Sequence, residues 1–174
     1  MIEMVDVQSI SITLAALSFI VAVSYYALNL REIRRNRQIA LTTTLLQPFM
    51  TDVGYNKILD LLAMQWDSLE DYMEKYDSRV NPENAASRMS LWNTCETLGM
   101  LYREGFLDLK TIYSTSGGII NSLWMKFKPV IESYRGSDYA TNAYANFEYL
   151  AMKISELIEF DKLAPRHKIP ERRK

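Results

Sequence analysis

Residues 7–30 read VQSISITLAALSFIVAVSYYALNL, a run of 24 residues without a charged side chain. As an α-helix, which rises 1.5 Å per residue, this run is about 36 Å long. The hydrocarbon layer of a bilayer is about 30 Å thick, so the helix crosses it with a modest tilt. The run contains neither proline nor glycine, and an unbroken helix satisfies its own backbone hydrogen bonds in lipid. It therefore predicts a membrane-spanning helix.

The charges on either side of this run predict its orientation. Glu3 and Asp6 precede it, whereas four arginines follow it closely: Arg31, Arg34, Arg35 and Arg37. Basic residues mark the cytoplasmic flank of a spanning helix, where they also meet anionic headgroups. We therefore expect a single-pass protein of the cell (inner or plasma) membrane, with the N-terminus outside and the larger part in the cytoplasm.

The run has two other interpretations. A cleaved signal peptide has basic residues before a shorter apolar stretch, whereas here the basic residues follow a longer one. A helix buried in the core of a soluble protein would also be apolar, but it does not require this placement of charges. The charge pattern favours the membrane anchor over both alternatives.

The rest of the chain divides by charge and by helix breakers. No proline or glycine occurs from Arg31 to Gln47, so the helix should continue beyond the membrane as a stalk. Residues 39–161 carry 17 acidic and 10 basic side chains, a net charge of −7, and a basic tail follows. We expect four segments: a short outer N-terminus and transmembrane helix (1–30), a basic flank and helical stalk (31–47), a cytoplasmic helical domain (48–161) and a basic disordered tail (162–174).

Local signals in the third segment predict helices. The clearest start is Asn81-Pro82-Glu83, because Asn caps a helix, Pro fits the first turn and Glu favours the positive end of the dipole. Thr51 or Asp52, Asp67-Ser68 and Asp108 are further starts. Gly117-Gly118 should break the helix that Asp108 begins, at about Ser116. The last helices are expected at 119–134 and 138–160.

No convincing alternating strand pattern and no internal repeat is present. We therefore predict an all-α fold: a long N-terminal transmembrane helix extended into a stalk, followed by a cytoplasmic irregular helical bundle. Cys95 has no second cysteine to pair with, and His167 is the only histidine, so we expect no metal site and no cofactor.

Several short motifs carry a resemblance to a known family. They are LWNTCETLG at 91–99, GFLD at 105–108 and FEYLA at 147–151, with Trp124 and Arg135 between them. The chain resembles an uncharacterised family of small prokaryotic single-pass membrane proteins. The resemblance implies an N-terminal hydrophobic helix, a basic flank and a helical domain of unknown function, and it implies no activity.

A stripe of small and polar residues runs along the expected membrane helix at spacings of three and four: Gln8, Ser11, Ala15, Ser18, Ala22, Tyr25 and Asn29. Small residues allow helices to approach closely in a membrane, and serine can hydrogen-bond across the contact. The stripe predicts packing against partner helices, in a homo-oligomer or a larger membrane complex. The wall of a water-filled pore and a chance periodicity are the alternatives.

Four charged residues of the helical domain form a possible polar cluster: Glu96, Arg103, Arg135 and Glu148. Such a cluster could bind a small polar ligand, whereas an internal ion-pair network that fixes helix packing is the commoner explanation. Trp92 and Trp124 are expected in the core.

These features predict a non-catalytic protein. We expect a single-pass membrane protein with a cytoplasmic helical domain for interaction or sensing. It should be oligomeric or part of a membrane complex. Its expected partner is the lipid bilayer, and we expect it not to bind nucleic acid. The first alternative is a homo-oligomeric channel lined by the stripe. The second is a membrane-tethered enzyme that uses Glu96 as its acid or base, which requires a carboxylate in a cleft.

Overall fold

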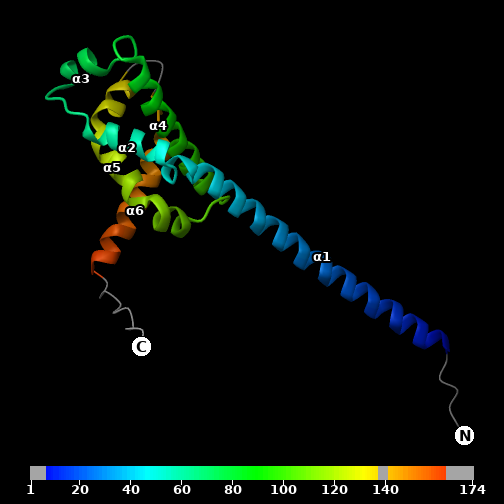
Figure 1. Ribbon diagram of the computed structural model, residues 1–174. Coiled ribbons are helices and arrows are strands. Elements are labelled where there is room, and N and C mark those ends of the chain that lie inside the picture. The colour runs from blue at the N-terminus through cyan, green and yellow to red at the C-terminus, as the bar shows by residue number, and fades with distance from the viewer. Residues whose placement is uncertain (1–6, 137–140, 164–174) are drawn as a thin grey trace, which may run out of the picture. The chain divides into compact units, whose positions relative to one another are not determined.

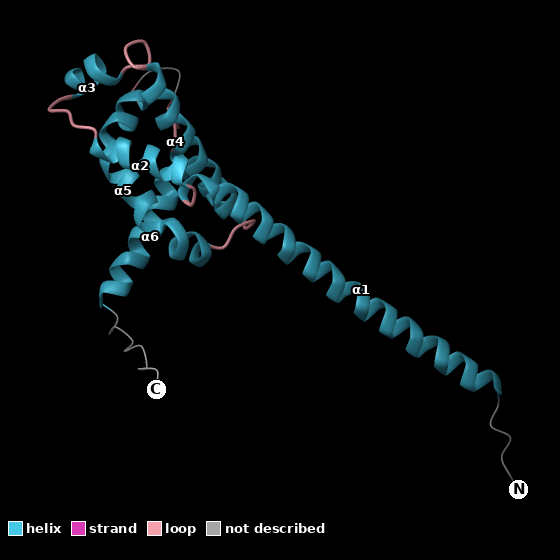
Figure 2. Cartoon of the chain, viewed as in Figure 1, coloured by secondary structure: helices cyan, strands magenta, loops and turns pink. Residues whose placement is uncertain are grey.

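The computed structural model describes residues 7–136 and 141–163, and every regular element in these ranges is helical (Figures 1 and 2). The all-α prediction is therefore confirmed. The elements are, in order, α1 (Val7–Leu46), the 3₁₀ turn η1 (Gln47–Phe49), α2 (Asp52–Ala63), α3 (Leu69–Tyr76), α4 (Pro82–Arg103), α5 (Leu109–Arg135) and α6 (Ala145–Leu163).

Helix α1 contains the apolar run and continues past the arginines without a break for 40 residues. At 1.5 Å per residue it is about 60 Å long, roughly twice the thickness of the hydrocarbon layer. Its side chains from residue 9 to residue 41 are all exposed. In the described part of the chain, α1 is the one helix long and apolar enough to cross a membrane, judged by length and composition.

The chain divides into two compact units, residues 1–41 and residues 42–174. The second unit begins inside the last turn of α1, where Thr42 and Leu46 are buried. Its core is built around α6, which packs against both α4 and α5. Helix α2 contacts α4 and α5, and α3 contacts α4. The predicted helical bundle is thus centred on three long helices (Figure 1).

Four helices begin directly after residues whose side chains were predicted to cap them. Thr51 accepts a hydrogen bond from the backbone N–H of Gly54 at the start of α2, and Ser68 accepts one from Asp71 at the start of α3. Asn81 and Asp108 cap α4 and α5 in the same way. A side chain that accepts an otherwise unpaired N–H specifies a helix start locally.

The expected break at Gly117-Gly118 is wrong, because α5 runs through both glycines. Gly117 is buried, and a Cβ there would lie 2.8 Å from Cδ2 of Tyr113 and 3.5 Å from Ile154 of α6. The missing side chain leaves room for the Tyr113 ring one turn earlier on α5, while the distance to Ile154 is an ordinary van der Waals contact. Burial of this part of α5 in the core outweighs the low helix propensity of glycine.

Helix α6 begins at Ala145, later than the expected start at Asp138. Asp138 itself lies outside the described residues. Tyr144, directly before the helix, has a φ of 57°, in the left-handed region. A non-glycine residue in this conformation cannot continue a right-handed helix, so α6 starts immediately after it.

Candidate functional site

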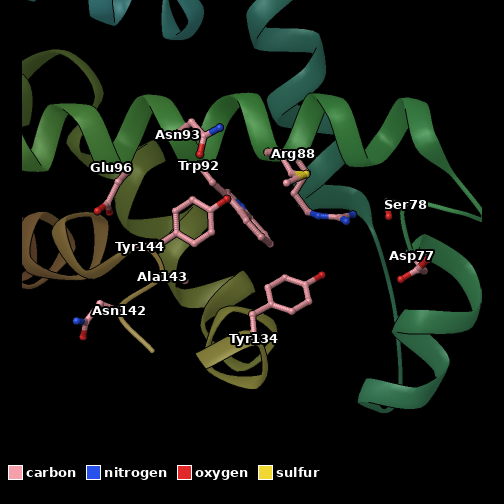
Figure 3. A pocket seen from close by; sticks show the side chains of 11 residues that line it. Asp77, Ser78, Arg88, Trp92, Asn93, Glu96, Tyr134, Asn142, Ala143 and Tyr144 are labelled. Atoms are coloured by element: carbon pink, nitrogen blue, oxygen red, sulfur yellow. The ribbon is translucent and has the colours of Figure 1, made fainter. Parts of the chain in front are cut away.

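A cavity of about 670 Å³ lies in the helical unit, between α4 and the segment that joins α5 to α6. Figure 3 shows the side chains around it. Those that matter most for its chemistry are Arg88, Trp92, Asn93, Glu96, Tyr134 and Tyr144. Ligand pockets in proteins commonly measure about 300–1,000 Å³ and combine apolar walls with a few polar groups. The cavity has the size and the lining of a small-molecule site.

Helix α4 supplies one side of this cavity. Arg88, Trp92 and Glu96 follow one another at intervals of four residues, so they lie along the same side of the helix. Trp92 is 1 % exposed and packs edge-on against Phe127, with ring centroids 5.3 Å apart. Both Trp92 and Trp124 are core residues, as predicted from the sequence.

Arg88 is a buried cation, with only 2 % of its surface exposed. Its Nη1 donates a hydrogen bond to Oδ1 of Asn84 at 2.8 Å, and its Nη2 donates to the carbonyl of Tyr76 at 3.2 Å. The guanidinium also lies over the rings of Tyr72 and Trp92, at 5.2 and 5.4 Å. These contacts hold the guanidinium in place next to the cavity.

The opposite side of the cavity includes Tyr134 from α5 and Tyr144, the residue directly before α6. The Tyr144 ring meets Trp92 edge-on at 5.4 Å (Figure 3). Burial is the main cause that raises the pKa of the Tyr144 hydroxyl, with smaller contributions from Tyr134 and Glu96. The hydroxyl therefore stays protonated at neutral pH and can donate a hydrogen bond into the cavity.

Glu96 has a structural partner as well as a place on the cavity wall. One carboxylate oxygen accepts the backbone N–H of Phe147 at 2.7 Å, and the other accepts the side-chain amide of Asn146 at 2.8 Å. Phe147 lies in the first turn of α6, whose N–H groups have no partner within the helix. Glu96 of α4 therefore caps α6 from outside, and its negative charge favours the positive end of the helix dipole.

All four residues of the predicted polar cluster lie around the start of α6. Arg103 donates a hydrogen bond to Oδ1 of Asn146 at 3.0 Å. Arg135 donates from Nη1 to Glu148 at 2.6 Å and from Nε to the carbonyl of Ala143 at 2.7 Å. Glu96 and Arg103 thus meet through Asn146, while Arg135 pairs with Glu148. Of the four, Glu96 lines the cavity.

The residues of the predicted membrane stripe lie on α1: Gln8, Ser11, Ala15, Ser18, Ala22, Tyr25 and Asn29. From Ser11 onward their side chains are exposed, and that of Gln8 is outside the described part. The Ser18 hydroxyl donates to the carbonyl of Leu14 at 2.8 Å, which satisfies it within its own helix. Packing of this stripe against partner helices stays a prediction.

The basic flank is also exposed on α1, at Arg31, Arg34, Arg35 and Arg37. Lys162 and Leu163, at the start of the predicted basic tail, still belong to α6. Residues 164–174 of that tail lie outside the described residues. The membrane-surface role of the basic residues remains a prediction.

Arg88, Tyr134 and Tyr144 were not predicted from the sequence as site residues. For Arg88 a signal was present, because it lies four residues before Trp92 and eight before Glu96. Residues four apart are neighbours on one helix face, so Arg88 shares the face of Trp92. For the two tyrosines no local pattern exists, since they reach Trp92 only through the packing of α5 and α6 against α4.

The described chain is an all-helical protein with one helix that has the length and composition of a membrane span. It belongs to the family "Domain of unknown function (DUF4760)", whose model matches residues 8–154. The resemblance to an uncharacterised family with a helical domain is thereby confirmed. No curated protein and no solved structure matches the chain.

Proposed function

We propose that this protein is a non-catalytic, single-pass membrane protein whose helical unit is a cytoplasmic sensing module for a small molecule. The observation that carries the proposal is the cavity of about 670 Å³ beside α4. Its lining combines a tryptophan and two tyrosines with a buried arginine, and it lies next to the start of α6. A bound molecule would contact both α4 and the start of α6.

Membrane attachment is the second part of the proposal. Large apolar side chains such as Leu14, Phe19 and Val21 are 65 %, 70 % and 66 % exposed on α1. A soluble protein rarely exposes a long continuous apolar surface, whereas lipid is a suitable solvent for it. The arginines that follow support a cytoplasmic location of the helical unit. The stripe of α1 would then face partner helices in an oligomer or a membrane complex.

The hydrogen bonds of Glu96 support a non-catalytic role. An enzyme would need this carboxylate free to exchange a proton with substrate. Instead, both of its oxygens accept hydrogen bonds from the first turn of α6. A carboxylate in that position stabilises the contact between two helices, and a ligand bound beside it would affect how α6 is held.

The role of the cavity as a ligand site is tested with a variant whose side chain fills it. Asn93 lines it from an exposed position on α4, so Asn93→Trp should fill the space without disturbing the core. Full-length protein in mild detergent is incubated with a deproteinised extract of the expressing cells and analysed by native mass spectrometry. We expect a small-molecule adduct on wild-type protein and a reduced adduct on Asn93→Trp.

Ala86→Trp is the matched control, because Ala86 is exposed on the same helix and does not line this cavity. The control should keep the adduct at the wild-type level. A wild-type protein without any adduct, or an adduct of equal abundance on Asn93→Trp, would contradict a small-molecule role for the cavity.

A further inference from the structure

Arg88 is buried and forms no ion pair with a carboxylate of the described residues, although Asp77 interacts with it electrostatically. Both acceptors of its hydrogen bonds, the amide oxygen of Asn84 and the backbone carbonyl of Tyr76, are neutral. Its Nε has no acceptor among the described residues. A buried charge is strongly disfavoured unless it is paired, so this guanidinium has unused capacity to bind an anion.

Of the two carboxylates that line the same cavity, Asp77 accepts hydrogen bonds through Oδ1 alone, whereas Glu96 accepts through both oxygens. Asp77 accepts a hydrogen bond from Nε of Arg79 at 2.9 Å and another from the Arg79 backbone N–H at 3.0 Å. The Arg79 side chain is the main cause that lowers the pKa of Asp77, and Arg88 contributes least. Glu96 caps α6. Asp77 therefore offsets the charge of Arg88 without pairing with it, and the place of a direct ion-pair partner is left for a carboxylate from outside.

A second donor on the cavity wall is also unsatisfied. The Nε1–H of Trp92 is buried and has no hydrogen-bond acceptor in the described residues. Two N–H donors on neighbouring turns of α4 thus lack acceptors beside the same cavity, whereas both carboxylates there have donors. Buried polar groups are nearly always paired, so a ligand rich in acceptor oxygens would complete this wall.

We infer that the cavity binds a small aromatic carboxylate, with its carboxylate on Arg88 and its ring among Trp92, Tyr134 and Tyr144. Arginine presents a planar row of donors that fits the two oxygens of a carboxylate. The tyrosine and tryptophan rings offer edges and faces suited to an aromatic body. This inference rests on the proposed function, and it names the class of molecule that the sensing module takes.

The inference is tested with two probes of similar shape and opposite charge, phenylacetate and 2-phenylethylamine. Binding to the full chain in detergent is followed by saturation-transfer NMR and by the melting temperature. Wild-type protein should bind phenylacetate at least about tenfold more tightly than the amine, as expected when one charged hydrogen-bonded pair decides the affinity. Asn93→Trp should bind neither probe.

Two variants of Arg88 separate recognition from folding. Arg88→Met should lose the preference for phenylacetate, while its melting temperature without ligand stays at or above the wild-type value, because a buried unpaired charge has been removed. Arg88→Lys keeps the charge but loses the planar row of donors, and should show an intermediate preference. A purely structural arginine would instead give an Arg88→Met protein with a lower melting temperature and no change in preference.

The experiments distinguish a wrong ligand class from a cavity that binds no small molecule at all. If 2-phenylethylamine binds as tightly as phenylacetate, and Asn93→Trp abolishes both, the cavity is a ligand site but the anionic class is wrong. If neither probe binds, the aromatic carboxylate class is overturned, and the adduct from cell extract decides separately whether the cavity is used. Retention of the phenylacetate preference in Arg88→Met would overturn the role of Arg88.

Discussion

Replacing Gly99 by alanine should destabilise the helical unit by about 2–3 kcal/mol, a typical cost of overpacking a tight contact. Gly99 lies where α4 crosses the start of α6. A Cβ at this position would lie 2.0 Å from the carbonyl oxygen and 2.5 Å from the carbonyl carbon of Asn146. Both are backbone atoms and cannot rotate away, so the two helices must move apart. The loss is measured by urea unfolding of the full chain in detergent.

Gly118→Ala is the matched control, because a Cβ at Gly118 meets no atom within 4 Å. Gly118 is an exposed position inside α5, where alanine should stabilise the helix by about 0.5–1 kcal/mol. If Gly99→Ala is as stable as wild-type protein, the close crossing of α4 and α6 is wrong. The same crossing positions the wall of the cavity, so Gly99→Ala should also weaken ligand binding.

Replacing Glu96 by alanine should lower the free energy of unfolding by about 2–3 kcal/mol, through the loss of a helix cap and of charge-assisted hydrogen bonds. The change leaves the N–H of Phe147 and the amide of Asn146 without the acceptors that they have now. Glu96→Gln keeps one acceptor oxygen and should lose about half as much. Urea unfolding at constant m-value measures both.

Glu156→Ala provides the comparison for this series. Glu156 pairs with Lys153 at 2.8 Å on the surface of α6, and its side chain is 59 % exposed. An exposed pair of this kind contributes at most about 0.5–1 kcal/mol. Equal losses for Glu96→Ala and Glu156→Ala would mean that Glu96 is an ordinary surface carboxylate and does not hold α6.

The helix starts were predictable because their causes are local. Thr51, Ser68, Asn81 and Asp108 each cap the helix that follows within three residues, and this geometry requires no knowledge of the rest of the chain. The long helix α1 was predictable for the same reason, since its apolar run and the absence of breakers are properties of a continuous stretch.

The features that were not predicted from the sequence depend on contacts between residues far apart in the chain. Gly117 is buried in α5, with Ile154 of α6 at van der Waals distance, and no signal near Gly117 in the sequence predicts that burial. The polar cluster was recognised as a set of charges, but its role in holding the start of α6 depends on Asn146 and Phe147. The cavity joins residues of α4 with Tyr134 and Tyr144, which no periodicity brings together.

We propose that residues 7–30 lie in lipid and that the helical unit lies inside the cell. Single-cysteine labelling in intact cells tests it most directly, because the native Cys95 is 0 % exposed and burial raises the pKa of its thiol. This thiol should therefore remain unreactive in the folded protein. Glu3→Cys and Ala86→Cys place reactive thiols on the two sides of the predicted span.

We expect a membrane-impermeant maleimide to label Glu3→Cys in intact cells, and to label Ala86→Cys only after the cells are lysed. Labelling of Ala86→Cys from outside intact cells would contradict the cytoplasmic location of the helical unit. Labelling of both positions only after lysis would contradict a helix that crosses the membrane.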